Sequence, residues 1–320
     1  MARRNNRLTP AELSPGHKPL YVVDDFESAM HLFLRDCKIR NISAHTITFY
    51  RTELIKFMRL LESQDIPTAP EKITSEIIKE NIILRMMELG RKETTINCTL
   101  RAVRTLFNFL VKESYILRSP MRDMTLVKQK RTIIQTFSRD QMRALLRQPD
   151  PYTFVGVRDA TFLMLLIETG VRVRELVDIK LSDIMWQDGV IKIDGKGYKQ
   201  RHVPIQITMK KQLQKYVKLR GELDHEALFV NVDNKPLKIR TVQEQMQAYG
   251  RAAGITGVRC SPHTARHTFA KMSVQNGADV FALQSVLGHA SLEMVRTYVN
   301  LFSHEVTAQH RKFSPLEGLQ

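Results

Sequence analysis

The chain has 320 residues, of which 43% are hydrophobic, and its 49 lysines and arginines outnumber its 33 acidic residues to give a net charge of +16. This length suits two domains of ordinary size, and the hydrophobic content is enough for folded cores, which excludes intrinsic disorder as the default interpretation. A protein this basic usually binds a polyanion, although charge also serves solubility. Because the positive excess is spread along the chain, the composition favours a nucleic acid as the binding partner, with the protein wrapped around it.

Neither export nor membrane insertion is indicated by the sequence. No segment approaches the roughly 18 apolar residues of a membrane span, and residues 1–20 lack the apolar core of a secretory signal. The cysteines Cys37, Cys98 and Cys260 lie far apart, without a CxxC pair or histidines at zinc-ligand spacing. We therefore expect a cytoplasmic, nucleoid-associated protein with reduced thiols, no membrane partner, no metal and no cofactor.

Residues 1–20 are predicted to form a flexible basic arm, because three prolines oppose a helix there and Glu12 is the one acidic residue. Residues 21–115 are predicted to form a helical domain. Apolar residues at four and three spacing indicate a first helix, carrying Phe26, Met30, Phe33 and Cys37. Ser43 is a candidate N-cap for a second helix, whose apolar face comprises Ile47, Tyr50, Leu54, Phe57 and Leu61.

Two further helices are predicted in this domain. One covers 75–89 and ends at Gly90, a typical residue after a helix C-terminus. The other begins near Thr94 or Thr95 and directs an apolar stripe inward, formed by Ile96, Leu100, Val103, Phe107 and Leu110. Its opposite face is basic and, together with Arg51 of the second helix, is either a solvated surface or a set of phosphate contacts: Arg101, Arg104, Asn108 and Lys112.

Residues 116–136 are predicted to link the two domains. The apolar periodicity lapses from Ser119 to Arg131, and basic residues outnumber Asp123 there: Arg122, Lys128, Lys130 and Arg131. Such a segment is either a basic linker extended along DNA, with Lys128, Lys130 and Arg131 as contacts, or an ordinary surface loop.

A second domain is predicted over 137–305. Ser138 is a candidate N-cap for a helix through Leu146, and the apolar segment 158–168 predicts a buried helix that ends at Gly170. Short β patterns at 190–193 and 202–205 flank glycine turns, which indicates a small antiparallel sheet. Further helices are predicted over 208–219, 241–253, 264–276 and 280–287.

Several segments of this domain carry groups suited to phosphodiester cleavage. An enzyme nucleophile that attacks a phosphodiester needs a proton acceptor, cations on the non-bridging oxygens, and an acid for the departing oxygen. Arginine suits the cationic role, because its rigid fork binds two oxygens and keeps its charge. The groups stand in SPHTARHTFA (261–270), LGHASLEMVRTYV (287–299), TGVRVREL (169–176) and DGKGYKQRHVP (194–204), and they are His263, Arg266, His289, Tyr298, Arg172 and Lys196. Each alone has an ordinary explanation as a cap, a core residue or surface charge; their conjunction indicates the breaking and rejoining of DNA.

These four segments resemble the motifs of the tyrosine recombinase (phage-integrase-like) family, most closely its Xer-type and transposon-encoded members. The resemblance covers 137–305 strongly, and 21–115 more loosely resembles the family's helical, SAM-like core-binding domain. It implies that Tyr298 is the nucleophile, and it assigns the other roles as follows: Arg172 and Arg266 on the phosphate oxygens, Glu175 orienting Arg172, His263 assisting proton transfer, His289 bonding the phosphate, and Lys196, with Lys199 as a rival, protonating the leaving 5′-oxygen.

The implied fold is mainly α, a two-domain clamp on duplex DNA, with the small sheet in the catalytic domain. The implied activity is site-specific recombination between two DNA sites by a homo-tetramer, or by a hetero-tetramer with a related recombinase. The rivals are a type IB DNA topoisomerase and a non-catalytic DNA-binding protein of the same fold. Residues 306–320 form a tail expected either to dock on a neighbouring protomer or to pack on its own domain.

Overall fold

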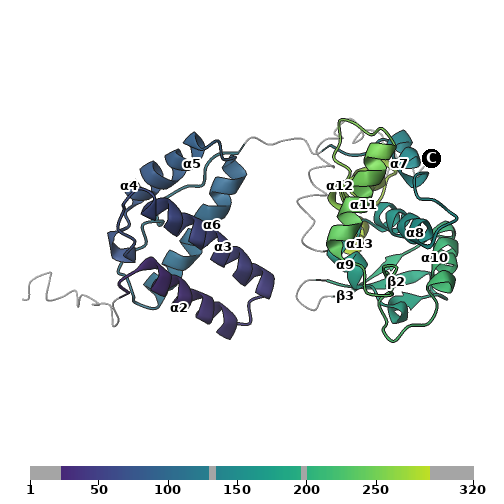
Figure 1. The fold of residues 1–320 in the computed structure, drawn as a ribbon, viewed down its shortest axis with the longest axis horizontal. Helices are drawn as coiled ribbons and strands as arrows, with labels where there is room; N and C mark the ends of the chain where they lie inside the picture. The colour runs from purple at the N-terminus through teal and green to yellow at the C-terminus, as the bar shows by residue number, and fades with distance from the viewer. Residues whose placement is uncertain (1–22, 130–134, 196–199, 289–320) are drawn as a thin grey trace, which may run out of the picture. The chain divides into compact units, whose positions relative to one another are not determined.

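The computed structural model describes residues 23–129, 135–195 and 200–288. Several predictions fall outside the described residues, namely those on the basic arm, Lys130, Arg131, Lys196, Lys199, His289, Tyr298 and the C-terminal tail. The chain divides into two compact units, 1–132 and 133–320 (Figure 1). None of the described helices is both long and apolar enough to cross a membrane.

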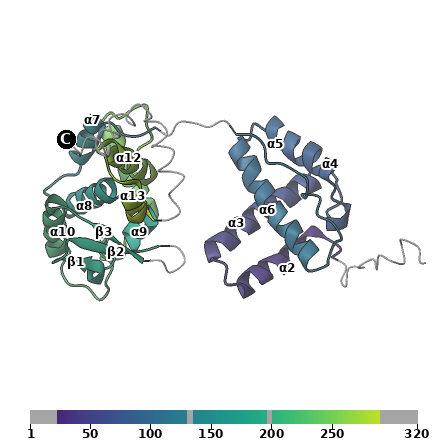
Figure 2. The same cartoon turned by 180° about the vertical axis from the view of Figure 1, so that it is seen from behind.

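The first unit is a helical bundle, as its apolar spacing predicts. Its main helices are α2 (Phe26–Ile39), α3 (Ala44–Glu62) and α6 (Glu93–Lys112), and α3 packs against both others (Figures 1 and 2). The apolar residues predicted to face inward on α2 and α6 are all buried, whereas on α3 Ile47 and Tyr50 are half-buried. The Ser43 hydroxyl accepts a hydrogen bond from the backbone N–H of Thr46 at 3.3 Å, which confirms the predicted N-cap.

A π-helical segment interrupts the helix predicted over 75–89. After the 3-10 turn η1 (Pro70–Lys72), the chain forms α4 (Ser75–Ile77), the π-helix η2 (Ile78–Leu84) and α5 (Arg85–Glu88). The side-chain amide of Gln64 donates to the backbone carbonyl of Asn81 at 2.8 Å and accepts from the Asn81 side chain at 3.1 Å. Gly90 follows with φ of 65°, as the predicted helix end requires.

The beginning of the predicted linker packs on the first unit. The side chain of Asn97, on α6, accepts from the backbone N–H of Val127 at 2.9 Å and donates to the Val127 carbonyl at 2.8 Å. Met121 is only 1% exposed and belongs to the core of this unit. The segment 116–127 is therefore held against α6, because an amide on that helix supplies the backbone hydrogen bonds that the segment lacks within itself.

The second unit is mainly helical with one small sheet. Its helices are α7 (Arg139–Leu146), α8 (Phe154–Thr169), α9 (Val173–Asp178), the 3-10 turn η3 (Leu181–Asp183), α10 (Ile207–Arg220), α11 (Ile239–Ala252), α12 (Pro262–Gln275) and α13 (Val280–Leu287). Ser138 and Gln141 form a capping box at the start of α7, which confirms that predicted helix start. The buried helix predicted from residue 158 begins four residues earlier, because Thr153 caps it.

The sheet has the antiparallel order β1 (Ile184–Met185), β2 (Val190–Asp194) and β3 (Gln200–Pro204). Ile193 faces Arg201 across the β2–β3 pair, so these strands form the predicted hairpin, while the two-residue β1 was not predicted. The sheet lies at one end of the unit, and α8 packs against α10 and α12 (Figure 1). The predicted fold class, mainly α with a small antiparallel sheet, is confirmed.

Candidate active site

Arg172 lies in the short connection between α8 and α9. Helix α8 ends at Gly170, whose φ of 61° lies in the left-handed region, and a Cβ there would come within 2.5 Å of the Phe269 ring. Both the turn and this close approach require glycine. The turn places Arg172 as the N-cap of α9, with 41% of its side chain exposed. The arginine is therefore held at a helix start while its guanidinium remains accessible.

The carboxylate of Glu175 lies between two arginines. Its Oε1 accepts from Nη1 of Arg172 at 2.9 Å and from Nη1 of Arg201 at 3.0 Å. Its Oε2 accepts from the backbone N–H of Arg172 at 2.8 Å and from Nη2 of Arg201 at 2.7 Å. We call Arg172, Glu175 and Arg201 the Glu175 cluster. The predicted orienting contact from Glu175 to Arg172 is present, and Arg201 adds a bidentate partner that sequence reasoning missed.

The ionisation of Glu175 follows from these contacts. Burial raises the pKa of its carboxyl, since its side chain is only 6% exposed, but the hydrogen bonds from Arg201 and Arg172 outweigh burial and hold the pKa below its usual value. Glu175 is therefore ionised at neutral pH and can hold both guanidinium groups.

Arg266 joins the same site from α12. Its Nη1 donates to the Gly170 carbonyl at 2.6 Å and its Nη2 to the Leu287 carbonyl at 2.7 Å. Burial, followed by the nearby charge of Arg172, lowers the pKa of Arg266 to about 10. The guanidinium stays protonated at neutral pH. Its hydrogen bond to the carbonyl of Gly170, two residues before Arg172, places the two predicted phosphate ligands near each other.

The described part of this site carries an excess of positive charge. The guanidinium groups of Arg172 and Arg201 bind the carboxylate of Glu175, and Arg266 lies close enough for its charge to interact with all three, so these four residues together carry a net charge of +2. Like charges gathered at a partly buried site repel one another, and a bound anion relieves that repulsion. The arrangement is suited to an anion such as a phosphodiester.

His263 lies one helical turn before Arg266, at the exposed start of α12. Its Nε2 is 2.8 Å from the Nε2 of His267, a residue only 3% exposed. Burial and the charge of Arg266 lower the pKa of His263, and burial with the charge of His263 lowers that of His267 to about 4. Both rings are therefore neutral at pH 7, one donating its proton to the other.

The sequence thus predicted four of the residues that lie at this site, and two others were missed. Arg172, Glu175 and Arg266 come together as the motifs predicted, and His263 lies beside them on α12. Arg201 and His267 were missed although both stand inside the motif segments. His267 had a signal, since it lies four residues after His263 and so on the same helix face.

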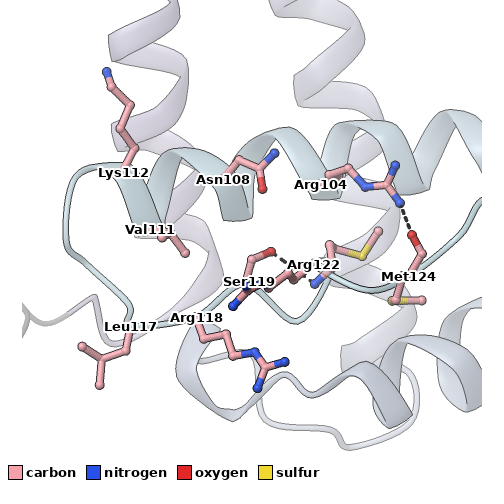
Figure 3. A pocket seen from close by; sticks show the side chains of 10 residues that line it. Arg104, Asn108, Val111, Lys112, Leu117, Arg118, Ser119, Arg122 and Met124 are labelled. Carbon is pink, nitrogen blue, oxygen red and sulfur yellow. Dashed lines mark hydrogen bonds between the residues drawn. The ribbon is translucent and has the colours of Figure 1, made fainter.

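The basic stripe predicted on α6 borders a groove of about 580 Å³ in the first unit (Figure 3). Its polar lining comes from α6 and from the segment after it: Arg104, Asn108, Lys112, Arg118, Ser119 and Arg122. Nη2 of Arg104 donates to the Met124 carbonyl at 2.7 Å, so this predicted DNA contact also holds the following segment in place. The other predicted contacts in the described part of this unit are exposed: Arg51, Arg101 and Lys128.

Two solved structures share the fold. A XerH site-specific recombinase bound to palindromic difH substrate matches with a TM-score of 0.76 at 20% identity, over 92% of this chain and 98% of that one. A lambda integrase tetramer bound to a Holliday junction matches with a TM-score of 0.69 at 18% identity, over 89% and 82%. A helical unit followed by a mainly helical unit with a small sheet is thus the two-domain fold of tyrosine recombinases.

Sequence comparison agrees with the fold. The phage integrase family matches residues 135–305, and its N-terminal SAM-like domain matches 31–114. Tyrosine recombinase XerC of Thermodesulfovibrio yellowstonii is 31% identical over 293 residues, which cover 89% of this chain and 95% of the relative. The chain belongs to the phage integrase family and is a site-specific recombinase of the tyrosine type.

Proposed function

We propose that the enzyme cuts one DNA strand through attack of the Tyr298 hydroxyl on a backbone phosphate. The phenolic oxygen bonds to phosphorus as the bond to the 5′-oxygen breaks, leaving a 3′-phosphotyrosyl link and a free 5′-hydroxyl. A phenol with a pKa of about 10 is mostly protonated at neutral pH, so it needs a proton acceptor or a strong cationic field. Rejoining is the reverse attack by a 5′-hydroxyl and requires no ATP, because the covalent link retains the energy of the broken bond.

The excess of guanidinium groups around Glu175 is the observation that carries this proposal. Arg172 and Arg266 are the proposed ligands of the non-bridging oxygens, on which negative charge develops during attack. Both groups are held in place by hydrogen bonds to partners within the protein. Cations placed in advance need not reorganise during the reaction, which is the main source of electrostatic catalysis.

The remaining proposed roles are those that the family resemblance implies, and they fit the chemistry of each side chain. His263 is the proposed partner in proton transfer, and its lowered pKa keeps it neutral and able to accept a proton at pH 7. Lys196 is the proposed acid for the leaving 5′-oxygen, with Lys199 as a weaker rival, and His289 is the proposed hydrogen-bond donor to the phosphate. No three His, Cys, Asp or Glu side chains gather as metal ligands within the described parts of the chain.

Duplex DNA carrying specific recombination sites is the proposed substrate, and a tetramer on DNA is the proposed assembly. The net charge of +16 supports a polyanionic partner. The groove beside α6 supports phosphate contacts by the first unit, because cationic side chains line it. The related lambda integrase is a tetramer on a Holliday junction, and two successive strand exchanges between two sites need four such active sites.

The domain roles form part of the same proposal. Residues 21–115 bind DNA as a core-binding domain, 116–136 connect the domains, and 137–305 carry out catalysis, with a basic arm over 1–20. Residues 306–320 are proposed to dock on a neighbouring protomer and so couple cleavage to assembly. Deletion after Phe302 should then abolish cooperative synapsis, measured by pairing of two labelled DNA sites, and unaltered synapsis would contradict the docking.

The decisive experiment replaces Tyr298 by phenylalanine, which removes only the hydroxyl. On a nicked suicide substrate, built from DNA that the purified protein protects, the unaltered enzyme should trap a covalent complex and Tyr298→Phe should trap none. Tyr152→Phe, at a residue 95% exposed, is the matched control and should trap complex normally. Equal trapping by Tyr298→Phe would contradict the assignment. Relaxation of plasmid without a specific site, in the absence of recombination, would indicate a topoisomerase instead.

A further inference from the structure

Arg201 connects three elements of the second unit through a single side chain. It stands on β3, and its Nη1 and Nη2 both donate to Glu175 on α9. Its Nε donates to the carbonyl of Val286 on α13 at 2.8 Å. The side chain is 12% exposed, so these contacts are largely shielded from water. A buried arginine with such a set of partners fixes the relative positions of the elements it joins.

We propose that Arg201 is a positioning residue for DNA cleavage, which acts through Glu175 to keep the guanidinium of Arg172 free for the phosphate. This inference rests on the proposed function, in which Arg172 binds the scissile phosphate. Arg201 itself needs no contact with DNA.

Glu175 has a limited number of hydrogen-bond acceptor sites. An ionised carboxylate offers about four lone-pair sites. Arg201 takes two of them, the Arg172 backbone N–H takes a third, and Nη1 of Arg172 takes the fourth. Because the carboxylate is saturated, it cannot bind Arg172 through two parallel hydrogen bonds. Without Arg201, two sites would open, and a bidentate pair between Glu175 and Arg172 would withdraw that guanidinium from the phosphate.

Arg201 also changes the net charge around Glu175. Glu175 alone would neutralise Arg172 and weaken its attraction for a phosphodiester. Arg201 compensates the carboxylate, so the cluster holds Arg172 in place and still presents net positive charge. In a partly buried site this difference is larger than it would be in water.

Arg201 also binds the C-terminal end of α13. The last carbonyls of a helix have no partner within the helix and attract cations. Here the carbonyls of Val286 and Leu287 accept from Arg201 and Arg266, respectively. Arg201 thus ties the C-terminal end of α13 and strand β3 to the cluster. In the sequence, Lys196 stands five residues before Arg201, and His289 stands three residues after Val286.

The test measures single-turnover cleavage on the suicide substrate and, separately, the dissociation constant for uncleaved DNA. We expect Arg201→Gln to slow cleavage by about 10²-fold, the cost of a small misplacement in an active site, while the dissociation constant changes little. Arg201→Lys keeps the charge but lacks the forked guanidinium. Its cleavage rate should therefore be at least about 10-fold below that of the unaltered enzyme, which corresponds to the loss of one charged hydrogen bond. Should Arg201→Gln not fold, Arg201→Lys decides the question.

Two further variants separate positioning from general stability. Arg220→Gln is the matched control, because Arg220 is also buried and donates to three backbone carbonyls, at 2.7–3.0 Å, outside the site. It should cost stability but leave cleavage per folded molecule unchanged. The double variant Glu175→Gln with Arg201→Gln should cleave faster than Arg201→Gln alone, because removing the carboxylate charge removes the competitor for Arg172.

The proposal is overturned if Arg201→Gln cleaves at the normal rate, if its loss merely matches that of Arg220→Gln, or if DNA affinity falls in parallel with the rate. It is equally overturned if the double variant is as slow as Arg201→Gln. These outcomes are distinct from failure of the proposed function, in which Tyr298→Phe would still trap covalent complex.

Discussion

Two groups of buried arginine and carboxylate lie in the second unit, and they differ in composition. At the Arg158 pair, Arg158 binds Asp159 at 2.7 Å with both side chains at most 4% exposed, and the Tyr249 hydroxyl donates to the same carboxylate at 2.8 Å. At the Glu175 cluster, one carboxylate serves two guanidinium groups, and Arg172 is 41% exposed. The first group pairs one cation with one carboxylate, whereas the second has one cation more than its carboxylate balances.

The carboxyl pKa values of the two groups shift in opposite directions. Burial raises the pKa of Asp159 despite the charge of Arg158, whereas the hydrogen bonds from two arginines keep that of Glu175 low despite burial. A single guanidinium thus suffices for a structural pair. At Glu175, the second guanidinium offsets the cost of burial and adds a cation beyond the one that balances the carboxylate.

The largest expected effect is on stability, at the Arg158 pair. Arg158→Met should lower the free energy of unfolding by about 3–5 kcal/mol, because it leaves the carboxylate of Asp159 buried without its cation. Urea denaturation measures this loss. The double variant Arg158→Met with Asp159→Leu should recover much of it, since neither charge remains. Cleavage per folded molecule should stay normal, and a selective loss of cleavage would contradict the structural role.

The next effect is on catalysis, at the Glu175 cluster. Arg172→Gln should slow single-turnover cleavage by about 10²–10³-fold, because one preorganised donor to the developing charge is lost. The free energy of unfolding should change by less than about 1 kcal/mol, since the pair is partly exposed. A stability loss as large as that of Arg158→Met would contradict the distinction between a structural ion pair at Arg158 and a catalytic group at Glu175.

The pH dependence of stability tests whether the buried His267 ring is neutral. The pKa of His267 is lowered from 6.5 to about 4 in the folded protein, so the unfolded chain binds more protons between these values. Stability should therefore fall as the pH drops from 6.5 to 4, by up to about 3 kcal/mol at 1.4 kcal/mol per unit. In His267→Gln this part of the pH dependence should disappear from thermal or urea unfolding curves. An unchanged pH dependence would exclude a buried neutral His267.

The smallest expected effect concerns the charge of Glu175. Glu175→Gln keeps the shape but weakens the hydrogen bonds to both arginines, so cleavage should fall by about 10-fold. Affinity for uncleaved DNA should rise slightly, because the site gains one net positive charge, and fluorescence anisotropy at several salt concentrations measures this. A fall in affinity would mean that the carboxylate, rather than the guanidinium excess, organises DNA binding.

Most helices could be predicted because their signals are local. The spacing of Phe26, Phe33 and Cys37 and the hydroxyl of Ser43 specify two helices without reference to the rest of the chain. The π-helix η2 could not be predicted, and one of its carbonyls, that of Asn81, accepts a hydrogen bond from Gln64, seventeen residues away in the chain. The packing of Val127 on Asn97 could not be predicted either, because the contact joins residues thirty positions apart.

The distinction between local signals and contacts distant in the chain also applies to the candidate active site. Arg172, Glu175 and Arg266 were predicted because they match the positions to which the motifs assign a role. Arg201 was not, because its importance comes from a carboxylate 26 residues earlier and a carbonyl 85 residues later in the chain. Lys196, His289 and Tyr298 lie outside the described residues, so their roles remain predictions.

The guanidinium contacts at the end of α13 have a thermodynamic consequence. The chain beyond Gly288 starts from carbonyls held by Arg201 and Arg266, and a Cβ at Gly288 would lie 3.7 Å from Nη1 of Arg172. A displacement of Gly288 therefore works against the hydrogen bonds that Arg201 and Arg266 make in the candidate active site. Such coupling is reciprocal. If a bound phosphate favours the binding of a partner to the residues after Gly288, that partner strengthens phosphate binding by the same free energy.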